Sequence, residues 1–213
     1  QKKKIFKYAM LFAMVCSLTT AMTSCSSNDD DTPQTGQLSE GDKYLQKVLA
    51  ANVDNTINPT YKALADGCEK LNNELEALTP GSITQQQVDN VCKTFLEARA
   101  NYERSEAFLL GAASHFLIDP HIDSWPLGLN ELYNYLKADH KYKITDQSIL
   151  GFHGIEFILF RDGKPRKAAE LNSHDSYNQD DIDFTIFSGT QELDYAKAVA
   201  EDLRNSVYRL ECS

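Results

Sequence analysis

The pattern of apolar and polar residues predicts a helical start to the folded domain. From residue 40 to residue 78, apolar side chains recur every three or four positions, which is the spacing of one helix face. Pro59 interrupts this stretch and is expected to kink or restart the helix, with Thr56 or Asn58 as the cap. The sequence Thr-Pro-Gly-Ser at 79–82 then predicts a turn.

The same spacing predicts four more helices. We place them at 84 to about 111, at 128–138, at about 145–160 with Thr145 as the cap, and from Ser188 or Thr190 onward. Ser188 and Gln191 fit a capping box for the last one. Residues 112–127 hold two prolines and are expected to be irregular, while 172–181 form a long polar loop. No strand is convincing, so the predicted class is all-α, an up-and-down helical bundle.

The N-terminal residues follow a different pattern and are not expected to belong to the bundle. Residues 1–24 join a lysine-rich start to a mostly apolar stretch, as a bacterial secretion signal does. The small residues before Cys25 resemble the lipobox of bacterial lipoproteins, which implies cleavage there and a diacylglycerol on the sulfur. Met22 stands where the lipobox usually has Leu, and the alternative is an ordinary signal peptide with an accidental Cys. Residues 25–39 predict a flexible tether, which leaves 40–213 as the domain.

The chain is acidic, with 21 Lys and Arg against 31 Asp and Glu and a net charge of −10. Loss of residues 1–24 removes four Lys, which leaves 17 basic residues and a net charge of −14. Such a surface argues against nucleic acid as a partner and is compatible with the capture of cations, although acidity usually serves solubility alone. The acidic stretch after Cys25 also resembles the surface-export signal of Bacteroidetes lipoproteins, and a plain solvated linker has the same composition.

Two cysteines of the predicted domain are candidates for a disulfide. Cys68 and Cys92 lie twelve residues on either side of Pro80, so they would come level on adjacent helices. An oxidising compartment would permit a disulfide, but its geometry is demanding, and two buried free thiols are favoured. No Cys-x-x-Cys spacing indicates zinc.

The main chemical clue is the sequence Gly-Phe-His-Gly-Ile-Glu at 151–156. His153 and Glu156 share a helix face because they are three residues apart. Their neighbours are apolar, and a charge in such company is costly unless it is paired or bound to a metal. Gly151 and Gly154 suggest close backbone packing or close approach of a ligand. Isolated His-x-x-Glu pairs are commonly ordinary hydrogen-bonded partners, so the spacing alone leaves both interpretations open.

Two other segments place polar residues beside apolar ones. Glu103 and Glu106 share a helix face, and Arg99 lies one turn earlier, where it can pair with Glu103. The usual explanation is a solvated face with local ion pairs, but residues 107–110 are too apolar to be freely exposed. The loop 112–127 adds three polar groups around the only tryptophan of the chain: Asp119, His121 and Asp123, with Trp125.

Four segments together resemble the imelysin-like family, which includes the insulin-cleaving membrane proteases: Arg99, Tyr102-Glu-x-Ser-Glu106, Ile122-Asp-Ser-Trp-Pro126 and Gly151-x-His-x-x-Glu156. The resemblance covers residues 40–213. It implies two helical bundles related by internal duplication, with the Gly-x-His-x-x-Glu site at their junction, in envelope proteins that are often iron-regulated. The sequence begins with Gln and stops within a strong apolar stripe, so we expect a fragment at both ends that holds the first bundle and lacks the second.

The resemblance also implies which residues form the site. The implied metal ligands are His153, Glu156, Glu103 and Glu106. The pocket around them would contain Arg99, Tyr102, Ser105, Asp123, Trp125 and Gly151. Tyr102 stands where many relatives have Trp. One imidazole nitrogen and several carboxylate oxygens suit iron, manganese or zinc and could admit copper, and the family points to iron or another divalent metal.

Three functions follow from these observations. The favoured one is a metal-capture lipoprotein, held at the outer membrane by its lipid, exposed at the cell surface and working with an iron or haem transport system. The second is a metallopeptidase in which Glu156 acts as a base toward metal-bound water. A zinc-peptidase helix needs two His four residues apart, and Phe157 stands at that position, so capture is favoured over proteolysis. The third is an envelope scaffold in which the motif only joins helices.

Overall fold

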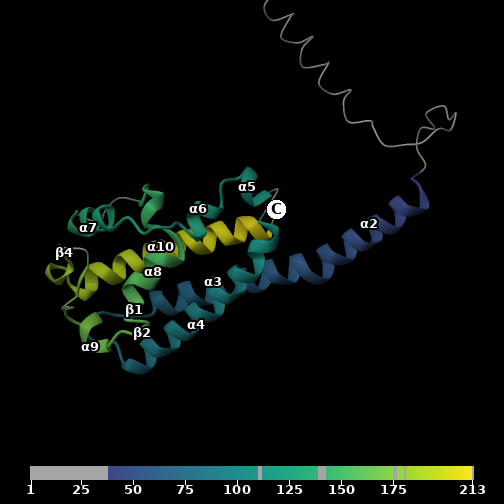
Figure 1. The fold of residues 1–213 in the computed structure, drawn as a ribbon. Helices are drawn as coiled ribbons and strands as arrows, with labels where there is room; N and C mark the ends of the chain where they lie inside the picture. Colours follow the sequence, from purple (N-terminus) through teal and green to yellow (C-terminus); the bar gives the residue numbers. More distant parts are fainter. Residues whose placement is uncertain (1–37, 110–111, 139–142, 175–176, 180, 213) are drawn as a thin grey trace, which may run out of the picture. The chain divides into compact units, whose positions relative to one another are not determined.

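A computed structural model describes residues 38–109, 112–138, 143–174, 177–179 and 181–212 (Figure 1). The predicted signal peptide 1–24, Cys25 and most of the tether 25–39 lie outside the described residues. The chain divides into one unit at 1–44 and another at 45–213. In the first unit, the described residues form the start of helix α2 (Glu40–Asn52), where Ser39 donates a hydrogen bond to Asp42. The second unit contains the core and the candidate site.

The first helical stretch is continuous through Pro59. Helix α2 passes into a π-helical turn at Val53–Ile57, and α3 (Asn58–Glu76) follows directly. Pro59 is the second residue of α3, and the wider π turn before it gives its ring room. The predicted caps are therefore wrong: neither Thr56 nor Asn58 caps α3 with its side chain.

Helix α4 (Gln85–Ser105) packs along α3. It begins at Thr84, whose hydroxyl accepts a hydrogen bond from the Gln87 N–H, while the Gln87 side chain accepts one from the Thr84 N–H. Beyond Ser105 the chain tightens into a 3₁₀ turn at Glu106–Phe108, so the helix ends earlier than predicted. The inner faces of the pair are lined by the buried side chains of Leu64, Leu71, Leu75, Val88, Val91 and Phe95.

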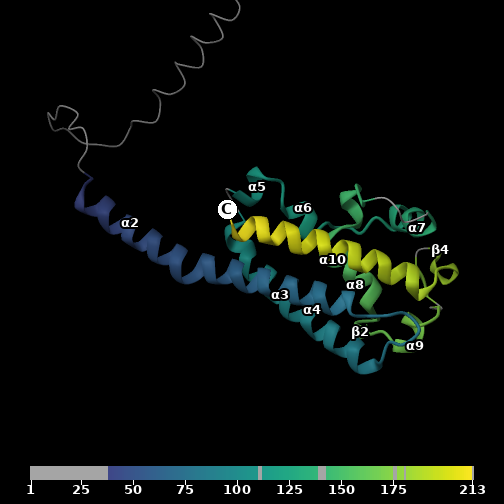
Figure 2. The same cartoon turned by 180° about the vertical axis from the view of Figure 1, so that it is seen from behind.

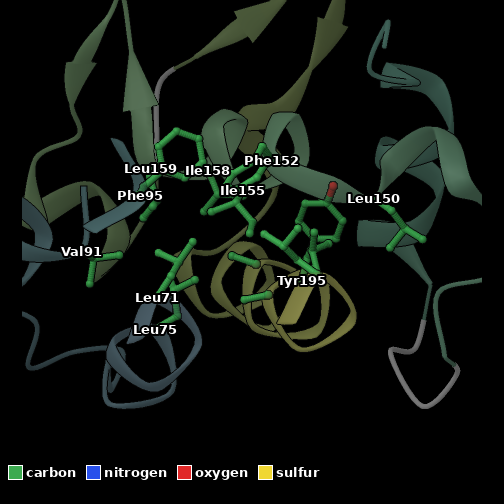
Figure 3. Close-up of a cluster of buried hydrophobic side chains, with 14 of the residues drawn as sticks. Leu71, Leu75, Val91, Phe95, Leu150, Phe152, Ile155, Ile158, Leu159 and Tyr195 are labelled. Atoms are coloured by element: carbon green, nitrogen blue, oxygen red, sulfur yellow. The ribbon is translucent and has the colours of Figure 1, made fainter. Parts of the chain in front are cut away.

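Helix α10 (Gly189–Glu211) completes the long part of the bundle. Its predicted capping box of Ser188 and Gln191 is confirmed. Both views show α10 running beside α3, and α8 (Gly151–Leu159) lies against α10 (Figures 1 and 2). The core where α3, α4, α8 and α10 meet is drawn in Figure 3 and contains Leu71, Leu75, Val91, Phe95, Phe152, Ile155, Ile158, Leu159 and Tyr195. Full burial of each such side chain contributes about 1.5–3 kcal/mol, so α8 is firmly anchored.

Short helices fill the connections between the long ones. Helix α7 (Leu129–Lys137) agrees with the prediction for 128–138. The segment 112–127 was predicted to be irregular, but it contains α5 and α6. The remaining short elements are α5 (Ala112–His115), α6 (Asp119–Ile122), α9 (Ala168–Leu171) and 3₁₀ turns at Gln147–Ile149 and Phe184–Ile186.

The helix predicted from Thr145 begins six residues later. Asp146, not Thr145, caps the 3₁₀ turn at Gln147–Ile149 by accepting a hydrogen bond from the Ser148 N–H. The chain then changes direction at Gly151, whose φ of +81° interrupts a right-handed helix. The apolar run is therefore split between a tight turn and α8.

Two small β-hairpins were not predicted. Strand β1 (Phe160–Arg161) pairs antiparallel with β2 (Lys164–Pro165), and β3 (Asn178–Gln179) pairs antiparallel with β4 (Ile182–Asp183). Two-residue strands are too short to show the alternation by which strands are detected. Most described residues are helical, and the all-α class is confirmed.

Two further expectations concern the cysteines and the membrane. Cys68 and Cys92 are free thiols, and burial raises the pKa of both to about 12, so the favoured alternative is confirmed. None of the described helices combines the length and the apolar composition that crossing a bilayer requires.

Candidate functional site

Gly151 docks the start of α8 onto the loop that carries Asp123. The two residues form an antiparallel backbone bridge. A Cβ atom at Gly151 would lie 2.3 Å from the carbonyl oxygen of Ile122, and the positive φ already disfavours a side chain. The first glycine of the Gly-x-His-x-x-Glu motif therefore fixes the distance between the His153 helix and this loop.

Gly154 serves the opposite side of the helix. A Cβ atom there would lie 2.4 Å from the hydroxyl oxygen of Tyr195 on α10. That buried hydroxyl donates a 2.6 Å hydrogen bond to the Ile149 carbonyl. Close packing of α8 on α10 thus needs a residue without a side chain at 154, as the sequence suggested.

His153 lies between two carboxylates. Its Nε2 is 3.0 Å from Oδ1 of Asp123, and its Nδ1 is 3.3 Å from Oε2 of Glu156. These hydrogen bonds, with that to Asp123 the stronger influence, raise the pKa of His153 to about 9. Without a bound metal the ring is therefore an imidazolium at neutral pH, and its hydrogen bond to Glu156 lowers the pKa of that carboxyl. The predicted pair is formed, with Asp123 as a third member.

Arg99 holds Asp123 from the other side. Its guanidinium donates to both carboxylate oxygens of Asp123, and its Nε donates a 2.6 Å hydrogen bond to Glu103. Burial alone would raise the pKa of Asp123, but the hydrogen bonds from His153 and Arg99 outweigh it and lower that pKa. The guanidinium also lies over the ring of Tyr102, 5.4 Å from its centre. The predicted pairing of Arg99 with Glu103 is confirmed.

Glu103 and Glu106 continue the network away from the histidine. The pKa of Glu106 is raised, first by partial desolvation and then by the negative charge and the hydrogen bond of Glu103. The connected order of side chains is Glu156, His153, Asp123, Arg99, Glu103 and Glu106. The two predicted ligand pairs are thus joined through an ion pair of Asp123 with Arg99.

Tyr102 and Ser105 lie in the core under this network. The Tyr102 hydroxyl donates a 2.7 Å hydrogen bond to Asp119, and burial is the main reason that its pKa is raised. The Ser105 hydroxyl is fully buried and donates to the Tyr102 carbonyl. These hydrogen bonds hold the C-terminal end of α4 in place, and Asp119 adds another carboxylate next to Tyr102.

A pocket of about 580 Å³ opens beside His153 and Glu156. Trp125 forms one edge, with its ring centre 4.6 Å from that of His153 and its side chain 73% exposed. A second hollow of about 460 Å³ lies near the other carboxylates and is lined in part by Tyr102, Glu106, Asp119 and Asp123. Asp123 lines this second hollow and is bonded to His153, which lines the first.

The sequence prediction missed part of the pocket wall. Phe157, Arg161 and Tyr177 line it, and the Arg161 guanidinium lies 4.9 Å from the ring centre of Phe157 and 4.4 Å from that of Tyr177. Phe157 could have been found, because it follows His153 by four residues on the same helix face. Tyr177 could not, because it lies in a polar loop with no periodic signal.

The side chains around His153 are of the chemical types that bind iron, but few of them are grouped closely enough to hold an ion. An imidazole nitrogen and carboxylate oxygens suit iron and similar metals. Within the described ranges, however, no group of three or more His, Cys, Asp or Glu side chains is arranged to hold a metal ion. The four-ligand set of His153, Glu156, Glu103 and Glu106 stays a prediction, with the first two as its best-formed part.

Comparison with known proteins decides the family. Residues 57–212 match the family model for imelysin, also classed as peptidase M75. The chain belongs to the imelysin family. Iron-regulated protein A of Synechococcus elongatus is 27% identical over 119 residues, which cover 56% of this chain and 33% of that protein. The resemblance inferred from the four sequence segments is therefore confirmed.

Two solved structures share the fold. A protein assigned as an iron-regulated protein A precursor from Parabacteroides distasonis matches with a TM-score of 0.68 and 26% identity, over 84% of this chain and 46% of that one. An imelysin-like protein from Psychrobacter arcticum matches with a TM-score of 0.58 and 12% identity, over 83% of this chain and 51% of that one. This imelysin chain thus spans a third to about half of the length of these relatives.

Proposed function

We propose that this imelysin chain binds iron as cargo at the cell envelope, for uptake, and that His153 and Glu156 are its primary ligands. The observation that carries the proposal is the position of the His153 ring, which lies at the wall of an open pocket with carboxylates at both nitrogens. Oxygen donors with one nitrogen suit iron. The names of the relatives point in the same direction, because two of them are iron-regulated proteins.

Asp123 and Arg99 would orient the ligands without being the first choice to bind iron. Asp123 holds Nε2 of His153, while Nδ1 is paired with the Glu156 carboxylate, and both of these residues line the pocket. Iron would replace the proton that Nδ1 shares with Glu156. Arg99 satisfies both oxygens of Asp123 and keeps that carboxylate in place. Partners of this kind typically change metal affinity by 10- to 100-fold when they are removed. Water or a chelator carried by the iron would supply further donors.

The predicted lipid anchor belongs to the same proposal. A secretion signal at 1–24 and a lipid on Cys25 would hold the domain at the outer membrane, where iron is captured before transport. Metabolic labelling with a radioactive fatty acid tests this step. Label should enter the native protein and not the Cys25→Ser variant, and equal labelling of both would refute the anchor.

Iron titration of the whole protein tests the binding site. We expect His153→Ala to weaken binding of ferrous or ferric ion by at least tenfold, as measured by calorimetry and by the iron content after gel filtration. His115→Ala is the matched control, because His115 is exposed on α5 and stands outside the network. Equal iron affinity in the native protein and in His153→Ala would refute the proposal.

The same variants separate the other two functions. Cleavage of an unfolded protein that stops with a chelator and with Glu156→Gln would favour a metallopeptidase. A His153→Ala variant that binds iron normally but melts early would favour a scaffold. Glu156→Gln keeps the size of the side chain and removes its charge, so it tests the ligand with little change in packing.

A further inference from the structure

The pocket beside His153 has the size of an organic-ligand site. Its volume of about 580 Å³ falls within the range of pockets that hold small molecules and cofactors. A single metal ion needs no such space, because its ligands stand about 2 Å away. The pocket volume is therefore unexplained by the binding of a bare ion.

The walls of the pocket are mainly aromatic and aliphatic. Phe157, Phe160 and Tyr177 line one part, and Trp125, Pro126 and Leu127 line another. Among the described residues no third His, Cys, Asp or Glu completes a ligand set with His153 and Glu156. These two facts fit a ligand that brings most of its own metal donors and presents a flat apolar surface to the protein.

Trp125 offers an exposed stacking surface at the mouth of the pocket. Its side chain is 73% exposed, although burying an aromatic side chain is strongly favourable. The ring is held beside His153, and the preceding Asp123 is bridged to Gly151, so the loop is tied to α8. A large aromatic ring kept in water next to candidate metal ligands is well placed to stack on a bound ligand.

The part of the wall that contains Phe157 and Tyr177 is held in place by a stack of side chains. The Arg161 guanidinium lies over the rings of both Phe157 and Tyr177 and donates to the carbonyls of Phe157 and Phe160. The ring centres of Phe157 and Tyr177 are 6.1 Å apart. Ordered aromatic walls lower the cost of binding, since fewer side chains lose freedom when the ligand enters.

We propose that the ligand of this pocket is iron held in a flat, conjugated organic chelate rather than the free ion. The aromatic walls would contact the plane of the chelate. Glu156 would contact its iron, and so would Nδ1 of His153 once it has released its proton to solvent. This inference rests on the proposed function and names the form in which iron arrives. Two sources share this chemistry: a ferric complex with one or two catecholates, which leaves coordination positions open, and an iron porphyrin.

Binding of four defined probes to the whole protein tests the inference. The probes are ferric 2,3-dihydroxybenzoate, iron protoporphyrin, ferric citrate, which has no aromatic plane, and 2,3-dihydroxybenzoate without iron. Calorimetry gives the affinities, and quenching of the single Trp125 reports occupancy of the pocket. We expect at least one of the two flat iron complexes to bind tenfold or more tightly than ferric citrate and than the iron-free compound. Whichever binds identifies the source.

Aromatic variants locate the contact. Tyr177→Leu should weaken the flat complex by about fivefold and leave ferric citrate unchanged, since one aromatic stacking contact is lost. Tyr208→Leu is the matched control, because Tyr208 is 62% exposed on α10 and does not line the pocket. Trp125→Leu, followed by calorimetry, is a second test at a position whose exposure makes a folding defect unexpected.

The outcomes separate this inference from the proposed function. If ferric citrate binds as tightly as the flat complexes, or if Tyr177→Leu and Trp125→Leu bind them normally, the inference is overturned while iron binding stands. Equal binding of iron-free 2,3-dihydroxybenzoate also overturns it. If no iron compound binds the native protein, both proposals fail.

Discussion

Helix α8 touches two charged clusters that have opposite exposure. At its outer face, His153 forms hydrogen bonds with Asp123 and Glu156 beside an open pocket, and the side chain of Glu156 is 53% exposed. At its C-terminal end, Arg166 donates to the Ile158 carbonyl and to Glu192 of α10, and both members of this ion pair are 0% exposed. Both clusters are made of paired acidic and basic side chains, but the first borders solvent and the second is fully buried.

The difference indicates which charges hold the fold and which are available to a ligand. Arg166 donates hydrogen bonds to a carbonyl at the helix end and to a buried carboxylate. Its side chain is fully buried, so it is not accessible to a ligand. A cation at a helix C-terminus is also stabilised by the helix dipole. His153 is bonded on both nitrogens, yet Glu156 and the pocket side of the ring reach solvent. Structural and functional charges therefore lie on one short helix and can be tested against each other.

The buried pair should give the largest effect. Arg166→Met should lower the free energy of unfolding by about 3 kcal/mol, because it leaves the Glu192 carboxylate buried without its main partner. Urea denaturation measures this change. Arg204→Met is the control, since its contact with Glu69 is 3.8 Å long and partly open to solvent, and it should cost about 0.5 kcal/mol or less. Similar losses in both variants would contradict the structural role of the buried pair.

Gly151→Ala should come next, with a loss of about 2–3 kcal/mol. The added Cβ meets the Ile122 carbonyl in addition to the strain of a positive φ. Gly163→Ala isolates the strain, because Gly163 also has a positive φ of +70° but has open space around it, and we expect a loss of about 1 kcal/mol. Thermal and urea unfolding would compare the two. Equal losses would show that the contact between α8 and the Asp123 loop does not matter.

The site cluster should make stability depend on pH in both directions. The pKa of His153 is raised to about 9, so its stabilising effect is complete below the unfolded value of about 6.5 and is lost as the pH rises through 9. The pKa of Asp123 is lowered, so its effect is present above about 4 and is lost as the pH falls below that value. Both effects are complete between about pH 4 and 6.5.

Comparison of the native protein with His153→Asn measures the histidine part. The difference in the free energy of unfolding should fall by about 1 kcal/mol between pH 6.5 and pH 10, once solvent screening at this half-buried site is allowed for. If the difference in the free energy of unfolding stays constant or grows with pH, the His153 ring is not hydrogen-bonded to two carboxylates as described.

The smallest effect on stability is expected at Trp125. Because its side chain is largely exposed, Trp125→Leu should change the free energy of unfolding by about 0.5 kcal/mol or less. Phe152→Ala, a core substitution on α8, should cost about 3 kcal/mol or more. A large loss at Trp125 would assign that ring to the fold and not to a ligand.

Local signals in the sequence predicted the long helices well and the connections poorly. Helical spacing located the start of α4, and helical spacing with one capping box located the start of α10, each to within a residue, because each signal acts over one or two turns. The start of α8 was misplaced because the φ of Gly151 depends on the Ile122 backbone, which is distant in sequence. The β-hairpins were missed for a different reason, because their strands are only two residues long and show no alternation.

Only part of the site could be predicted, because only some of its contacts lie within a single helix. His153 and Glu156 are three residues apart on one helix, so their contact follows from spacing. The contact of Asp123 with both His153 and Arg99 depends on how a loop packs across α8 and α4, and the sequence placed it only in the neighbourhood. The buried pair of Arg166 with Glu192 gave no local signal, because its two members come from separate elements.

X-ray absorption spectroscopy at the iron edge tests the central claim most directly. Iron bound to the native protein should show the scattering of one imidazole ring, and this feature should be absent in His153→Ala and retained in His115→Ala. Iron bound without an imidazole signal in the native protein, or with the same signal in His153→Ala, would contradict the assignment of His153 as a ligand.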